Sequence, residues 1–340
     1  MKKIIMSCFA AAAAVAMACS CASCRSAKKA QSADEADTVA LVGPTFSADS
    51  AYAFTAAQCA FGPRTMNSEA HDRCGEWIMG KFSSYGMKVT TQDIDVKGYD
   101  GTTLKCRNII ARHNPDAAVR VLICAHWDSR PWADNDPDST NWRKPVMAAN
   151  DGASGVGVML ELARLLQNDT AASVGVDFVC FDAEDWGTPQ WSDMPDNADS
   201  WALGAQHWAE TLPDAGKPVC GILLDMVGAQ GAKFYQEGVS KQYASDLLNR
   251  VWRTASQIGY GSFFPMSDGG MITDDHVPVN EKAGIPCIDI IPFFPDCQQS
   301  SFGPTWHTVS DDIDHIDRNS LKAVGQVLVQ MLWGDGFAGM

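Results

Sequence analysis

The sequence is poor in positive charge, and its body lacks cysteine pairs at metal-binding spacing. Against 41 Asp and Glu stand only 26 Lys and Arg among 340 residues, a net charge of −15. No basic stripe can meet phosphates, so nucleic acid is not an expected partner. The eight cysteines beyond residue 38 include no C-x-x-C pair, which argues against a cysteine-liganded zinc site. Cys124, Cys180 and Cys220 lie in or beside apolar runs and are expected to be buried. In an exported chain, two of the other cysteines could form a disulfide.

The apolar segment at the N-terminus is too short to cross a membrane. Residues 4–18 follow two lysines and precede small residues around Cys19, the pattern of a bacterial export signal. This stretch resembles a loose lipoprotein cleavage box, which would place a lipid on Cys19 and leave residues 20–38 as a tether. Cys21 or Cys24 could carry the lipid instead, and ordinary cleavage to a soluble periplasmic protein is the alternative. We therefore expect an exported protein whose membrane contact is limited to such an anchor.

Residues 39–340 show no internal repeat and no break in composition, so we expect one catalytic domain after a leader of residues 1–38. Apolar residues make up 46% of the chain, enough for a large core. Short β-branched runs alternate with segments of helical periodicity, which predicts a three-layer α/β/α sandwich around a central mixed, twisted β-sheet. Strands are expected at 88–97, 104–113, 119–125, 176–181, 221–224 and 285–292, and helices at 49–61, 67–85, 156–166, 200–212, 240–259 and 317–333.

Ionisable side chains stand where the predicted strands end. The carboxyl ends of parallel strands meet at one edge of a sheet, so we expect these side chains to converge. Many carboxylates at one edge repel one another unless a cation neutralises them. Carboxylate and imidazole together suit zinc with one open position, and a carboxylate left free of the metal can carry protons. The residues in question are His126 and Asp128, Asp151, Glu184 and Asp185, Asp225, Asp274 to His276, and His307.

These motifs resemble the zinc aminopeptidase clan with co-catalytic metals, and more closely its glutaminyl cyclase branch. The resemblance covers nearly all of residues 45–335 and rests on six motifs in the same order. One departure is Asp185, where animal cyclases and most related peptidases have Glu, so that a shorter side chain must reach the metal. The six motifs are His126–Ser129, Asn150–Gly155, Phe181–Asp185, Leu224–Ala229, Asp274–Pro278 and Trp306–Thr308.

The resemblance implies a role for each matching position. It implies one zinc ion per chain and cyclisation of N-terminal glutaminyl residues of peptides or proteins to pyroglutamate, with release of ammonia. Zinc would polarise the γ-carbonyl group while a carboxylate carries a proton from the α-amine to the departing nitrogen. The implied zinc ligands are Asp151, Asp185 and His307; the proton shuttle is Glu184; Asp275 stabilises the reacting amide and Asp225 is a second acid linked to it; Trp191 and Trp306 are walls of the substrate pocket.

Several alternatives stay open. His126 either holds a carboxylate in place or binds a second metal, because His126 and Asp225 match the second-metal ligands of two-zinc peptidases. Two zinc ions would indicate an aminopeptidase that hydrolyses N-terminal residues. An inactive carrier of peptides or sugars is a third reading, against which the intact Glu184 argues. Asp151 could instead cap the following helix, and Glu184 with Asp185 could form a solvated acidic turn.

Overall fold

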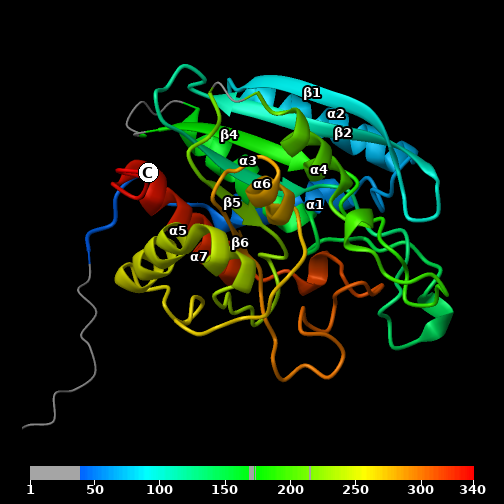
Figure 1. The fold of residues 1–340 in the computed structure, drawn as a ribbon. Helices are drawn as coiled ribbons and strands as arrows, with labels where there is room; N and C mark the ends of the chain where they lie inside the picture. The colour runs from blue at the N-terminus through cyan, green and yellow to red at the C-terminus, as the bar shows by residue number, and fades with distance from the viewer. Residues whose placement is uncertain (1–38, 168–171, 173, 214–215) are drawn as a thin grey trace, which may run out of the picture. The chain divides into compact units, whose positions relative to one another are not determined.

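A six-stranded mixed β-sheet runs through the centre of the structure (Figure 1). This computed structural model describes residues 39–340 except 168–171, 173 and 214–215, and the described residues belong to one compact unit. The expected leader and its candidate lipidation sites Cys19, Cys21 and Cys24 lie outside the described residues. Within the part described, no helix is both long and apolar enough to cross a membrane.

The sheet has the order β1-β2-β4-β3-β5-β6. The strands β4, β3, β5 and β6 are parallel, whereas β1 and β2 run antiparallel to their neighbours. The parallel strands therefore share one carboxyl edge, as the sequence predicted. The strands are β1 (Lys88–Lys97), β2 (Thr103–His113), β3 (Arg120–His126), β4 (Gly175–Phe181), β5 (Gly221–Leu224) and β6 (Cys287–Ile290).

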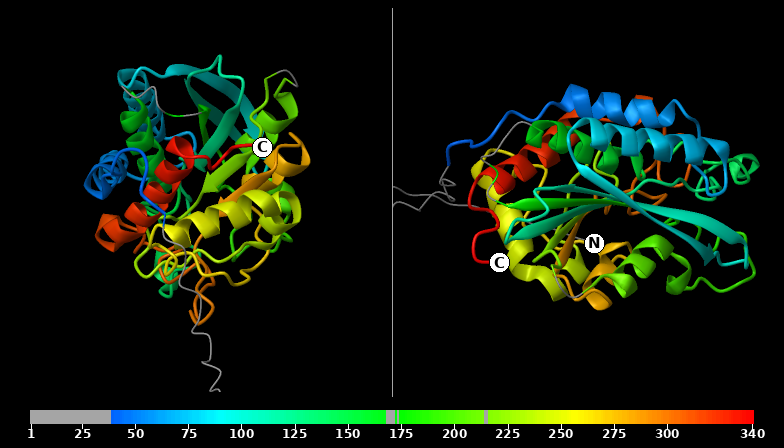
Figure 2. Two further views of the ribbon diagram at one scale, coloured as in Figure 1. Left: turned by 90° about the vertical axis from the view of Figure 1, so that its left-hand side faces the viewer. Right: turned by 90° about the horizontal axis from the view of Figure 1, so that it is seen from above.

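Helices cover both faces of the sheet, which confirms the three-layer architecture (Figure 2). Alternate residues of β3 enter two separate cores, because successive side chains of a strand point to opposite faces. Ile123 lies in the larger core with residues of α1, α2, α3 and α7, while Leu122 lies in the smaller core with residues of α4 and α6. The helices are α1 (Ala48–Cys59), α2 (Glu69–Ser84), α3 (Ala153–Leu166), α4 (Leu203–Thr211), α5 (Gly238–Gln257), α6 (His276–Glu281) and α7 (Arg318–Trp333).

Among the described residues, the structure adds one α-helix and three short 3-10 helices, Ser139–Asn141, Ala198–Ser200 and Ile313–His315, and it shows the state of the cysteines. Helix α6 was not predicted because it is six residues long, too short to show a helical period, and contains Pro278. All eight cysteines of the described chain are free, so the disulfide left open by the sequence is not formed. Cys124, Cys180 and Cys220 are buried, as expected for small hydrophobic side chains.

Candidate active site

The carboxyl edge of the parallel strands borders a cavity of about 290 Å³. Glu184 reaches it from the end of β4, Asp225 from the end of β5, and Asp151 from the turn before α3. The volume suits one side chain with its amino group better than a long ligand. The cavity is lined by Asp151, Glu184, Asp196, Ala198, Trp201, Asp225, Met226, Met271, Ile272, Thr273, Asp274, Ile291, Phe302, Trp306 and His307.

Asp151, Asp185 and His307 form a first group of potential metal ligands. One ligand atom of each lies within 4.8 Å of the others, and all three side chains are buried. His307 Nε2 is 3.2 Å from Asp185 Oδ1 and 3.5 Å from Asp151 Oδ2. The Oδ2 atoms of both aspartates are buried without a hydrogen-bond partner. Buried oxygens of this kind are costly unless a cation or a donor meets them, so this trio fits zinc.

Short loops with unusual backbone geometry position these ligands. Gly152 has φ of +88°, and a Cβ atom there would lie 2.8 Å from His126 Cε1. A Cβ atom at Gly155 would lie 2.2 Å from the Leu224 carbonyl oxygen, so α3 can begin directly against β5. Ala183 and Met226, each next to an active-site acid, and His307 itself also have positive φ. Left-handed backbone at non-glycine residues is strained, and such strain gathers at functional sites.

Buried aspartates outside the first group hold the ligand loops by their backbone. Asp128 accepts hydrogen bonds from the N–H groups of Glu184 and Asp185, at 3.1 and 3.2 Å. Asp311 accepts from the N–H groups of Asn150 and Asp151, at 2.7 and 3.0 Å. Asp151 therefore receives a cap instead of supplying one, because the N-cap of α3 is Gly152. Asp151 is therefore not the helix cap that the sequence left open. Glu184 and Asp185 do not form a solvated acidic turn, because both side chains are buried.

His307 is fixed by aromatic rings and by a carboxylate behind it. Its ring stacks on Trp306 with centroids 3.8 Å apart, and Trp201 lies on it at 6.2 Å with an interplanar angle of 9°. Asp134 Oδ1 lies 3.5 Å from His307 Nδ1, which leaves Nε2 facing the ligand aspartates. Asp134 is in turn paired with the fully buried Arg130, with 2.7 Å between Nη2 and Oδ2. A carboxylate behind a histidine fixes its tautomer for metal binding.

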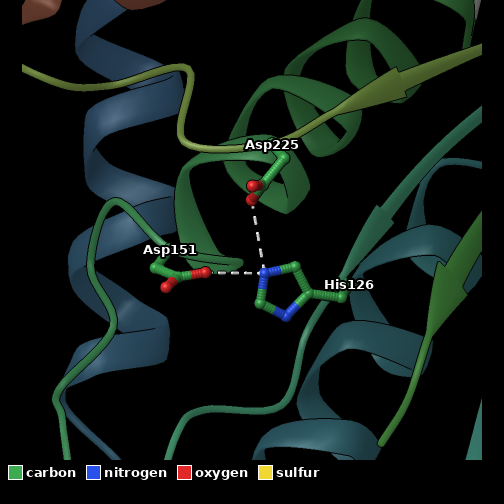
Figure 3. Close-up of side chains that lie close together, drawn as sticks. All are labelled: His126, Asp151 and Asp225. Carbon is green, nitrogen blue, oxygen red and sulfur yellow. Dashed lines mark hydrogen bonds and ion pairs between the residues drawn. The ribbon is translucent and has the colours of Figure 1, made fainter. Parts of the chain in front are cut away.

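His126, Asp151 and Asp225 form a second group of potential ligands, shown in Figure 3. His126 Nε2 lies 2.9 Å from Asp151 Oδ1 and 3.3 Å from Asp225 Oδ1. Its Nδ1 lies 3.5 Å from Asp128 Oδ1. Burial opposes a charge on this ring, but the three carboxylates outweigh it and raise the pKa of His126 well above its usual range.

Three further acids of the cavity, Glu184, Asp225 and Asp274, have raised pKa values. Burial is the main cause, and the neighbouring Asp185 adds to it, so the pKa of Glu184 is raised well above its ordinary value. Burial and Asp151 raise the pKa of Asp225 to about 6, although His126 lowers it. Burial and Asp225 raise the pKa of Asp274 to about 7. Titratable groups shifted in this way and gathered in a cleft mark a site for acid–base chemistry.

Two positions named by the resemblance lie elsewhere than expected. Asp275 is fully buried and does not line the cavity, whereas the preceding residue Asp274 does. Trp191 also lies outside the lining; it packs against Trp132 with centroids 6.0 Å apart and under the Arg143 guanidinium at 4.1 Å. In the Asp-Asp pair the sequence offers no way to choose which member faces the ligand, because the turn between them sets their directions.

Other residues of the site were not singled out from the sequence. Trp201 lines the cavity and stacks on His307, and Arg130 lies 4.8 Å from the Trp201 ring. Arg130 also donates to the carbonyl oxygen of Asp185, at 3.2 Å. Asp134 and Asp311 support ligands from behind. Each lies in a loop without periodicity, so only their contacts in the folded chain show what they do.

The fold and the site together define a class. A buried carboxylate–imidazole trio beside a free carboxylate, at the carboxyl edge of a mixed sheet, is the arrangement of a metal-dependent enzyme of the zinc-exopeptidase-like fold. The chain belongs to peptidase family M28, whose model matches residues 108–332. The family and its structural neighbours imply a zinc-dependent enzyme.

Relatives of two activities resemble the chain. The crystal structure of Bacteroides thetaiotaomicron glutaminyl cyclase bound to N-acetylhistamine is 45% identical, with a TM-score of 0.83, over 86% of this chain and 99% of that one. Aminopeptidase YwaD of Bacillus subtilis is 30% identical over 63% of this chain and 40% of its own. The glutaminyl-peptide cyclotransferase of Bos taurus is 24% identical over 65% of this chain and 64% of its own. The chain thus spans less than two thirds of these two curated relatives.

Proposed function

We propose that the protein is a zinc-dependent glutaminyl-peptide cyclotransferase. It converts the N-terminal glutaminyl residue of peptides or proteins to pyroglutamate and releases ammonia. The observation that carries this proposal is the small cavity in which Asp151 and His307 face Glu184 and Asp274 between aromatic walls. The 45% identity to a bacterial glutaminyl cyclase over 86% of the chain supports the same activity.

Asp151, Asp185 and His307 would hold the ion. When bound, zinc supplies a Lewis acid that polarises the γ-carbonyl oxygen of the substrate glutamine. Asp128 and Asp311 keep the ligand backbones in place through their hydrogen bonds, and Arg130 neutralises Asp134 behind His307. The side chain of Asp185 is shorter than the Glu side chain that the resemblance implies at this position. Arg130 Nη1 lies 3.4 Å from Asp185 Oδ1.

Glu184 moves the proton. The neutral α-amine nitrogen forms a bond to the γ-carbonyl carbon, and the bond from that carbon to the amide nitrogen breaks. Glu184 accepts a proton from the attacking amine and gives it to the departing nitrogen, which leaves as ammonia. No nucleophile from the protein is needed, because amine and carbonyl belong to one residue and are already close together. The raised pKa of Glu184 suits a group that must both take and return a proton.

Asp274 accepts a hydrogen bond from the reacting amide nitrogen, a role that the resemblance had implied for Asp275. Asp274 is 4% exposed and lines the cavity, whereas Asp275 is closed off. Asp225 lies beside it, and a proton on one of these two acids relieves their repulsion. Trp306, Trp201 and Phe302 form the walls and exclude water that would compete with the amine.

An aminopeptidase remains the second candidate, because His126, Asp151 and Asp225 also lie within reach of one ion. The cyclase is favoured by the 45% identity to a bacterial glutaminyl cyclase, against 30% identity over 63% of the chain to the aminopeptidase. An assay with a Gln-Phe dipeptide separates the two. The cyclase releases ammonia and leaves a pyroglutamyl product, whereas an aminopeptidase releases free glutamine and phenylalanine without ammonia.

We also propose that the protein is exported and acts in the bacterial periplasm or at a membrane surface through a lipid on Cys19. The basic start, the short apolar run and the small residues before Cys19 support this. Mass spectrometry of the mature N-terminus tests it. Diacylated Cys19 is the expected result, and a chain cleaved elsewhere without lipid would contradict the anchor.

A further inference from the structure

A closed polar cluster lies directly behind Asp274. One side-chain atom each of Asp274, His276 and Asp289 lies within 4.8 Å of the others. Asp274 is 4% exposed and the other two are fully buried. Asp289 belongs to β6, where it is paired with Leu223 of β5, and His276 begins α6. The cluster thus connects the cavity-facing acid to the rigid sheet.

Glu237 determines which ring nitrogen of His276 donates a hydrogen bond. Its carboxylate accepts hydrogen bonds from the N–H groups of Val239, Ser240 and Ile272, and from the Ser240 hydroxyl. Burial opposes the charge, but His276 and the backbone donors lower the pKa of Glu237 to about 2. Glu237 is therefore an ionised acceptor, and His276 Nε2, 3.2 Å away, must donate to it. In a neutral ring this leaves Nδ1 as an acceptor.

Asp289 cannot be an ordinary unpaired carboxylate. Both of its oxygens and His276 Nδ1 are buried without a hydrogen-bond partner among the described residues, and Asp289 Oδ2 lies 3.9 Å from Nδ1. The titratable groups facing it are His276, Asp274, Asp225, Glu237 and Cys287. Burial first, and then these acids, raise the pKa of Asp289 well above its ordinary value. A buried ion without a donor is too costly, whereas two neighbouring carboxyl groups can share one proton.

We propose that Asp289 is a positioning residue that shares a proton with the carboxyl group of Asp274 and so holds Asp274 at the wall of the cavity. Asp274 Oδ2 is buried and without a partner, while Oδ1 accepts from the N–H of Asp275 at 2.5 Å. The shared proton supplies the missing contact. The Asp289 N–H donates to Ser240 Oγ at 2.9 Å, so the backbone of Asp289 is also tied to the Glu237 network. This inference rests on the proposed function of Asp274.

Two variants of Asp289 test the proposal in the full, zinc-loaded enzyme. Asp289→Asn keeps a donor in the same shape and is expected to retain kcat within about threefold of wild type. Asp289→Ala removes the donor, and kcat is expected to fall about 100-fold with little change in KM, because Asp274 loses its position. Zinc content, measured by mass spectrometry, stays unchanged in both. Asp177→Asn is the matched control, since Asp177 is a buried strand aspartate paired with Arg120 at 2.9 Å.

Infrared spectroscopy reports the proton directly, independently of activity. The difference spectrum of wild type minus Asp289→Asn at neutral pH is expected to show the carbonyl stretch of a protonated carboxylic acid, which Asp177→Asn leaves in place. Absence of that band, or an Asp289→Asn enzyme as slow as Asp289→Ala, overturns the proposal. A second metal ion that is lost in Asp289→Asn also overturns it in favour of a cation site. If wild type forms no pyroglutamate, the proposed function fails, while the band still decides the protonation of Asp289.

Discussion

Asp151 stands between two groups that look alike in composition but differ in what surrounds them. On one side, the Oδ2 atoms of Asp151 and Asp185 are buried without a hydrogen-bond partner, and Arg130 and Asp134 support His307 from behind. On the other side, His126 is enclosed by carboxylates that it pairs with directly. Both sides hold a buried carboxylate oxygen without a partner and an imidazole of raised pKa, but Arg130 and Asp134 stand behind the histidine of the first side, whereas carboxylates surround that of the second. A set of metal-binding residue types therefore does not define a metal site until the partners of each atom are counted.

The largest expected effect concerns a residue that belongs to neither group. Glu184→Gln keeps the shape of the side chain but cannot accept a proton, so kcat is expected to fall about 1,000-fold while zinc stays bound. Ammonia release measures the fall in kcat, and metal content measures separately whether zinc stays bound. Glu161→Gln is the control, because Glu161 is buried in α3 and paired with Arg164 at 2.7 Å. An enzyme that loses less than about tenfold with Glu184→Gln would remove Glu184 from the proton path.

A ligand on the first side is expected to be essential for the ion. Asp185→Asn replaces a carboxylate with a weak neutral ligand, and zinc affinity is expected to fall more than about 100-fold. Titration against a zinc chelator measures the affinity without reference to turnover. If the zinc affinity of Asp185→Asn equals that of wild type, Asp185 is not a zinc ligand and the ion is not bound by the first group.

His126 on the second side is expected to matter less. His126→Asn removes the imidazole ring that pairs with Asp151 and Asp225, so zinc affinity and kcat are each expected to fall only about tenfold, with the number of ions unchanged. His71→Asn serves as the control, since His71 is a buried histidine whose Nε2 lies 2.8 Å from Asp182. Loss of a whole zinc ion in His126→Asn would turn the second side into a metal site and favour the aminopeptidase.

The fold and most of the site could be predicted because their signals are local. A run such as 176–181 predicts a buried strand from its own residues, and β4 occupies Gly175–Phe181. The convergence of Glu184, Asp225 and His307 follows from the shared carboxyl edge of parallel strands. The sequence could not place Trp191, because loop 182–202 has no period that fixes its path. Nor could it choose Asp274 over Asp275, since one residue of backbone turn decides which carboxyl group faces the cavity.

The smallest expected effect is on stability without metal. Asp225 and Asp274 have folded pKa values of about 6 and about 7, above the ordinary 3.8, so the unfolded chain loses their protons first as the pH rises. Their contribution is fully present below 3.8 and is lost as the pH rises through about 7. His307, whose pKa burial opposes but Asp185 raises to about 9, extends the loss above neutrality. The metal-free protein should therefore have a lower melting temperature at about pH 8 than at about pH 5. Bound zinc should reduce the difference between these two melting temperatures. A metal-free protein that gains stability over this interval would contradict these shifts.

The number of zinc ions per chain tests the central claim most directly. Equilibrium dialysis of the purified protein against zinc, followed by elemental analysis, should give one tightly bound ion in wild type. The count should stay at one in His126→Asn and fall to none in His307→Ala. Two tightly bound ions in wild type, one of them lost with His126, would show that both sides of Asp151 bind metal and would contradict the account.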